Sequence, residues 1–167
     1  MAGGATYTPI ATTTLSSSAS SYTFTSIPQT YTDLVLVCQA KTASSSQDIQ
    51  MQVNGDTASN YSFTFMGGNG SVTGSSRASN QTALTGDAYG YVNATDFNLS
   101  IHNFMNYSNT TTYKTVISRS NNAAVGVDGL VNLWRSTSAI NSIKVFLTSS
   151  INLATGCTFT LYGIKAA

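Results

Sequence analysis

Few side chains in this 167-residue chain could carry out catalysis or hold a metal. The sequence contains no glutamate, six aspartates, one histidine and two cysteines. His102 could act as a general base only if a nucleophile converged on it, and no Gly-x-Ser-x-Gly nucleophile elbow is present. Polysaccharide hydrolysis needs a pair of carboxyl groups, which six scattered aspartates do not readily supply. We therefore expect no enzyme activity, no catalytic residue and a structural role for His102.

Two short motifs resemble ligand-binding loops but have simpler interpretations. Asn54-Gly55-Asp56, even with Asp48 nearby, lacks the density of carboxylates found in calcium loops. Asn-Gly favours the positive φ angles of a type I′ turn instead. The glycines from 67 to 74 lack the Lys-Ser/Thr pair and the strand–helix context of a phosphate-binding loop. We expect no metal and no cofactor.

The remaining side chains that could react or bind a partner are thiols and aromatic rings. Cys38 and Cys157 lie in apolar segments, and buried free thiols are the expected state, with a disulfide left open until their separation is known. Most of the seventeen aromatic residues occupy positions expected to face a core. Tyr89, Tyr91 and Tyr107 fall in expected loops, and we take them as candidate contacts for a subunit or a glycan.

The composition indicates a folded chain with a hydroxyl-rich and amide-rich surface. There are 25 Thr, 24 Ser and 14 Asn, and only 8% of residues are charged, against about a quarter in typical domains. No basic run exists to bind nucleic acid, and no apolar stretch reaches the ~20 residues of a membrane span. Residues 1–4 do not begin a secretory signal, so synthesis in the cytoplasm is expected. A net charge of +1 suits an assembled protein better than a free one.

Apolar residues recur at every second position in most of the chain, which predicts β-strands. The alternating apolar residues are expected to face the core, with Thr, Ser, Gln and Asn facing solvent. These segments are 22–24, 49–53, 61–65, 97–101, 143–147 and 157–161. The run from Leu34 to Cys38 is continuously apolar, which predicts a strand covered on both faces. The segment 125–134 is apolar on both parities and contains Gly126 and Gly129, which indicate a bulge or bend.

The spacing of strands and turns predicts one domain over residues 1–167. About eight to ten short strands are expected to form an antiparallel, jelly-roll-like β-sandwich. Residues 1–15 are either a first strand, which we favour, or an arm laid on another subunit. Residues 67–79 are rich in Gly and Ser and are expected to be a long exposed loop.

Several segments together resemble a known group of proteins. They are Ser26–Leu34, Gly129–Arg135, Ala139–Ile143 and Phe159–Ile164. They are similar to segments of small β-rich virion proteins of tailed bacteriophages, abundant in aquatic and cyanobacterial phages. The resemblance spans residues 7–164 and carries no enzymatic residues. It implies a jelly-roll-like sandwich with Trp134 in the core, Arg135 paired with an aspartate, and a homotrimer.

The resembled proteins include capsid decoration (cement) proteins and modules of tail or head fibres. We expect a decoration protein on the exterior of the virion, with copies of itself and the major capsid protein as partners. Its expected task is to stabilise contacts between shell subunits. The alternative is a tail- or head-fibre protein that recognises a host-surface glycan, although no shaft or attachment domain is evident.

Overall fold

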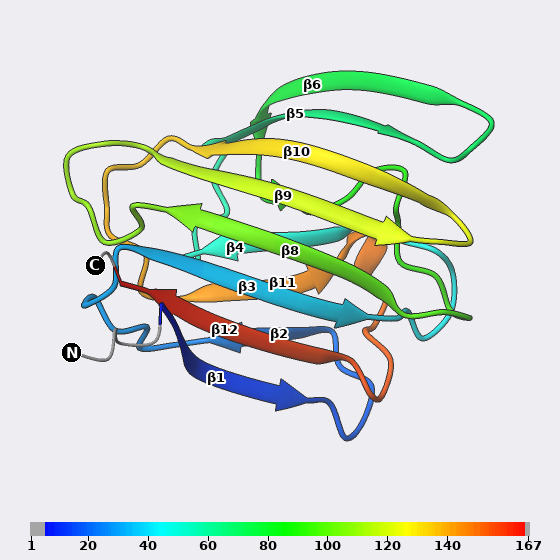
Figure 1. Ribbon diagram of the computed structural model, residues 1–167, viewed down its shortest axis with the longest axis horizontal. Coiled ribbons are helices and arrows are strands. Elements are labelled where there is room, and N and C mark those ends of the chain that lie inside the picture. The colour runs from blue at the N-terminus through cyan, green and yellow to red at the C-terminus, as the bar shows by residue number, and fades with distance from the viewer. Residues whose placement is uncertain (1–5, 166–167) are drawn as a thin grey trace.

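Two antiparallel β-sheets stacked face to face form the protein (Figure 1). The computed structural model describes residues 6–165. The strands are β1 (Tyr7–Thr14), β2 (Ser21–Phe24), β3 (Asp33–Ala40), β4 (Ile49–Val53), β5 (Tyr61–Gly68), β6 (Thr73–Gln81), β7 (Leu84–Thr85), β8 (Asn98–Met105), β9 (Lys114–Asn122), β10 (Gly126–Trp134), β11 (Ile143–Leu147) and β12 (Thr158–Ile164). A short 3-10 turn covers Thr148–Ser150. The predicted all-β sandwich is confirmed, with twelve strands in the described residues rather than eight to ten.

The strand order explains how the two sheets come to differ in size. The large sheet has the order β1-β12-β3-β8-β9-β10-β5-β6, and the small sheet has the order β2-β11-β4-β7. In Figure 1 the small sheet lies behind the large one, and the β5–β6 hairpin forms the far edge of the large sheet. Without the hairpins β5–β6 and β9–β10, eight strands remain, four in each sheet. The two hairpins therefore widen the large sheet beyond β8.

The core lies between the sheets and follows the predicted alternation in most strands. Ile49, Met51 and Val53 of β4 are fully buried, as are Phe159 and Leu161 of β12. Trp134 is also buried and stacks on Tyr61, with ring centroids 6.5 Å apart. The two cysteines are free and buried. The sequence pattern thus identified much of the apolar interior.

Asn54-Gly55 forms a turn that also holds the indole of Trp134. Both residues have positive φ angles, 53° and 67°, and the Asp56 N–H donates to the Val53 carbonyl at 2.9 Å. These are the features of a type I′ turn. The Asp56 carboxylate accepts hydrogen bonds from the Ala58 N–H, the Asn60 amide and, at 2.7 Å, the Trp134 indole.

The expected pairing of Arg135 with an aspartate is not found. Its guanidinium donates instead to the Ser59 carbonyl and to the side-chain oxygen of Asn80. The Asp56 carboxylate accepts a hydrogen bond from the indole N–H of Trp134, the residue that precedes Arg135.

The predictions for residues 1–15 and 67–79 had different outcomes. Residues 7–14 form strand β1, paired with β12 of the same chain, while residues 1–5 lie outside the described residues. The prediction of a long loop over 67–79 is wrong, because only residues 69–72 connect β5 to β6. Most of β6 is exposed, as expected, but its backbone pairs with β5. Main-chain hydrogen bonding forms this strand without large apolar side chains.

Candidate interaction surface

The face of the large sheet that points away from the small sheet is unusually apolar. We call it the outer face, defined by the outward-pointing residues of the eight strands. Large apolar side chains on β5, β8, β9 and β10 are 40–70% exposed there: Met66, Leu99, Met105, Ile117, Val127 and Val131. Ile117 lies directly opposite Val131, and Ile101 directly opposite Val37. These cross-strand pairs join the apolar side chains into a patch across several strands.

On β8 the direction of the side chains is the reverse of the prediction. Leu99 and Ile101 were expected to face the core, but they point outward. Their polar neighbours Asn98, Ser100 and His102 point inward and are fully buried. On β10 the outward residues Val127 and Val131 flank the buried Asp128 and the buried Asn132 in the same way. Here the sheet is polar inside and apolar outside.

The polar inner side is stabilised because a loop from residue 86 to 97 supplies hydrogen-bonding partners. The Asp128 carboxylate accepts the backbone N–H groups of Ala88 (2.9 Å), Tyr89 (2.8 Å) and Gly90. The Asn98 amide donates to the Gly90 carbonyl and to Ser120. Buried polar groups are tolerated when they are bonded in this way. The hydrogen-bonded loop therefore covers the polar side chains on the inner side of β8–β10, and the apolar side chains of these strands point outward.

His102 sits inside this polar layer and cannot reach a substrate. Its ring nitrogens are 3.0 Å from the Ser100 hydroxyl and 2.9 Å from the Ser118 hydroxyl. Burial lowers the pKa of its imidazole to about 3, so the ring is neutral at physiological pH. With no exposed surface on the imidazole, the arrangement is a structural hydrogen-bond network.

The other reactive side chains are equally shielded. Burial raises the pKa of the Cys38 thiol far above its ordinary value, which opposes formation of a reactive thiolate. Asp87 is fully buried, and burial together with the charge of Asp48 raises its pKa well above the usual range. Among residues 6–165 no three His, Cys, Asp or Glu side chains come together in a possible metal site.

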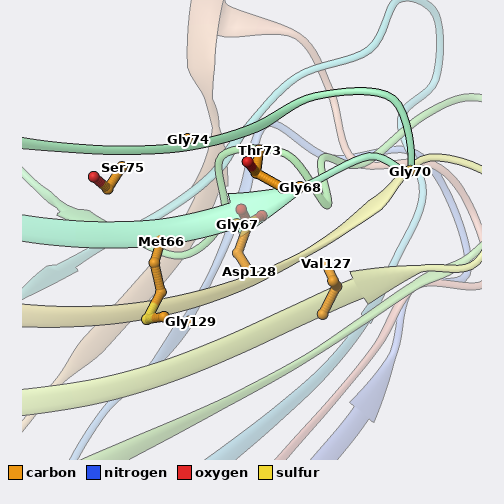
Figure 2. Close-up of a pocket in the computed structure, with 10 residues that line it drawn as sticks. All are labelled: Met66, Gly67, Gly68, Gly70, Thr73, Gly74, Ser75, Val127, Asp128 and Gly129. Atoms are coloured by element: carbon orange, nitrogen blue, oxygen red, sulfur yellow. The ribbon is translucent and has the colours of Figure 1, made fainter.

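A shallow hollow of about 860 Å³ lies at the end of the outer face where β5, β6 and β10 meet (Figure 2). Met66 lies beside Gly129 at this place, and Val127 lies further along β10. A Cβ atom added to Gly129 would meet nothing closer than Met66 Cγ at 3.9 Å. The hollow exists because glycine leaves the sheet surface bare between these exposed side chains.

The three tyrosines predicted to contact a partner or a glycan lie in different environments. Tyr107 is fully buried and its hydroxyl donates to the Pro28 carbonyl, so the prediction is wrong for this residue. Tyr89 is partly buried under the β5–β6 hairpin, where Cβ atoms on Gly67 or Gly74 would collide with its ring or hydroxyl. Tyr91 is exposed. The structure does not gather these rings into one aromatic site.

The sequence analysis did not predict an exposed apolar face, although two runs of residues have a pattern consistent with one. The runs 34–38 and 125–134 are apolar on both parities, which is typical of strands covered on two sides. In β3, Leu34 and Leu36 are buried inward, while the outward Val35 is buried among neighbouring side chains and Val37 stays half-buried. No third layer of strands or helices covers this face in the described part of the chain.

Very little charge accompanies the apolar side chains of the outer face. In the eight described strands of the large sheet, the outward-pointing charged residues are Asp33, Arg77 and Arg119. Arg119 lies between Ile101 and Gly129 on the neighbouring strands. It makes no hydrogen bond or ion pair with any other residue in 6–165. An unpaired cation thus stands in an otherwise weakly charged surface.

Because comparison with protein families and with curated proteins found no match, the function must be inferred from the residues and their geometry. No protein-family model matches the chain, and no curated protein matches it significantly. None of the described segments forms a helix with the length and hydropathy of a membrane span.

Proposed function

We propose that this chain is a structural protein of a tailed-phage virion, a capsid decoration (cement) protein that assembles as a homotrimer on the shell exterior. It binds the major capsid protein and stabilises the contacts between shell subunits, without enzymatic activity. The observation that carries the proposal is the exposed apolar outer face. Monomeric soluble proteins rarely expose contiguous apolar patches of more than a few hundred Å². Such a face suits a protein whose working state is an assembly.

The burial of the reactive groups supports an adhesive role over a chemical one. His102, Cys38 and Asp87 all lie inside the sandwich with no exposed surface. A general base or nucleophile must reach the atoms it acts on. The surface offers backbone, hydroxyl, amide and apolar groups, which provide contact area and hydrogen bonds.

The strand order supports a jelly roll as the finer description of the fold. With β5–β6 and β9–β10 set aside, the sheets read β1-β12-β3-β8 and β2-β11-β4-β7. Successive strands of this set alternate between the two sheets up to β4 and return in mirror order, as in two interlocked Greek keys. The two hairpins are then insertions that extend one sheet, and they carry four of the six exposed apolar residues named on the outer face.

A density map of the intact virion of the phage that encodes this chain tests the proposal. We expect hundreds of copies on the outside of the shell, each group of copies bridging neighbouring capsid subunits. A shell that loses the protein should also disassemble at a lower temperature and regain its resistance when the purified protein is added back. Tens of copies at the tail or at fibres would support the glycan-binding alternative, and absence from the particle would overturn both.

A further inference from the structure

We propose that the outer face is buried against a second copy of this chain, with Arg119 of one copy paired to Asp33 of the next. The inference deepens the proposed function, because it rests on the proposed homotrimer and names the surface that would hold it together. Sites elsewhere on the protein then remain available to the shell.

The size of the outer face fits a stable interface between copies. Eight strands spaced about 4.8 Å apart, each with about seven residues rising about 3.4 Å, give a face of roughly 900 Å². A standard specific interface buries about 800 Å² on each partner. The face of one copy is therefore large enough for one such contact, and in a ring of three copies it would be divided between the two neighbours.

The composition of the outer face favours a copy of the chain as the occupant. Interfaces between identical subunits are more apolar than other protein interfaces, with charged residues depleted at their centre. Here the apolar residues on β8, β9 and β10 occupy the middle of the sheet, and Arg119 is the charged residue among them. With a net charge of +1, copies of the chain repel one another little.

Each copy carries both halves of an ion pair on this face. Arg119 has no partner within residues 6–165, and a charged group buried in an interface needs one. Asp33 starts β3 on the same face, where its carboxylate accepts one hydrogen bond, from the Asn106 N–H. The remaining acceptor sites of that carboxylate suit a guanidinium. Contact between Arg119 of one copy and Asp33 of the next can be repeated around a ring.

Sedimentation equilibrium of the purified protein tests the apolar part of the interface. Val131→Asp places a charge on the outer face, and Val72→Asp places the same charge in the β5–β6 turn, at 52% and 55% side-chain exposure in the wild type. We expect the wild type and Val72→Asp to form the same oligomer. Val131→Asp should be monomeric, with a circular dichroism spectrum like that of Val72→Asp and a lower melting temperature, because it lacks the stabilisation that the interface provides. Equal oligomerisation of both variants would overturn the assignment of this face.

Charge exchange tests the ion pair even if Val131→Asp fails to fold. Arg119→Asp and Asp33→Lys are each expected to weaken self-association by about tenfold or more, because like charges then meet across the contact. The double variant should restore association, since the charges are exchanged but still opposite. Failure of the double variant to recover would overturn the pairing.

The failure of this inference is distinguishable from failure of the proposed function. A wild type that stays monomeric at all concentrations, yet co-sediments with phage shells in hundreds of copies, would overturn the self-association and leave the decoration role standing. A wild type that forms the oligomer but does not bind shells would do the reverse.

Discussion

The side-chain amide of Asn132 on β10 pairs with both backbone groups of Thr85 on β7. It accepts the Thr85 N–H and donates to the Thr85 carbonyl, each at 2.9 Å. β7 ends the small sheet, and its other neighbour is β4. The amide therefore replaces a missing strand at this edge and links the two sheets where the large one extends beyond the small one.

Removing this amide should loosen the junction between the sheets. Asn132→Ala leaves the two Thr85 backbone groups without their partner, and unmade hydrogen bonds at partly buried groups cost about 1–3 kcal/mol each. We expect the free energy of unfolding to fall by about 2 kcal/mol, measured by guanidinium denaturation. Asn121→Ala, an exposed asparagine on β9, is the matched control. A loss no larger than that of Asn121→Ala would contradict the linking role.

His102 should make the protein less stable in acid. Burial lowers the pKa of its imidazole from its ordinary value of 6.5 to about 3. Between those pH values the unfolded chain takes up a proton that the folded protein excludes, so this contribution is present above pH 6.5 and is lost as the pH falls toward 3. The slope is about 1.4 kcal/mol per pH unit. We expect the stability advantage of the wild type over His102→Gln to shrink between pH 7 and pH 4. An advantage that is constant with pH would show that His102 is not the group responsible.

Asp87 should act in the opposite direction. Burial, aided by the charge of Asp48 and opposed by the Ile49 N–H, raises its pKa well above the ordinary 3.8. The folded protein keeps a proton that the unfolded chain releases, so this contribution is present below pH 3.8 and is lost as the pH rises through the window up to the raised pKa. Asp87→Asn cannot ionise and keeps an oxygen for the Ile49 N–H.

We expect Asp87→Asn to gain stability relative to the wild type as the pH rises from 4 to 8. At pH 4 the two proteins should differ little, which provides the reference point of the same denaturation series. The comparison needs variants because the wild type combines His102 and Asp87, whose contributions have opposite signs. A stability difference that does not grow with pH would contradict burial of the neutral acid.

The turn at Asn54-Gly55 and the β6 strand show what local sequence can and cannot predict. A type I′ turn depends on two adjacent residues that tolerate positive φ. The Asn-Gly dipeptide alone was therefore sufficient to predict the turn. β6 has no such signal, because Thr73–Gln81 contains mostly small polar residues. It forms through backbone pairing with β5, and pairing between strands is a property of the fold rather than of either segment.

The direction of β8 shows why the interaction surface was not predicted. An alternating pattern states which residues share a face but not which face is covered. Leu99 and Ile101 would normally point inward, but their neighbours Asn98 and His102 find buried partners at Gly90, Ser100 and Ser118. Ser100 lies on β8 itself, but Gly90 comes from the 86–97 loop and Ser118 from the neighbouring strand β9. A local pattern does not predict these two distant partners. Tyr107 was misplaced for the same reason, because its acceptor at Pro28 is distant in the sequence.

Gly67 is expected to be the glycine of the β5–β6 hairpin at which an added side chain is least well accommodated. A Cβ atom there would lie 2.2 Å from Asp128 Oδ1 and 2.7 Å from the Val127 carbonyl. Gly67→Ala must therefore displace the carboxylate that accepts the N–H groups of residues 88–90, and overpacking costs about 1–3 kcal/mol. Gly129→Ala, on the next strand but facing the open hollow, should change stability by no more than about 0.5 kcal/mol. Amide hydrogen exchange at residues 88–90 should accelerate only in Gly67→Ala, because only there does the loop lose its acceptor. Equal exchange in both variants would mean that the loop is held by contacts other than Asp128.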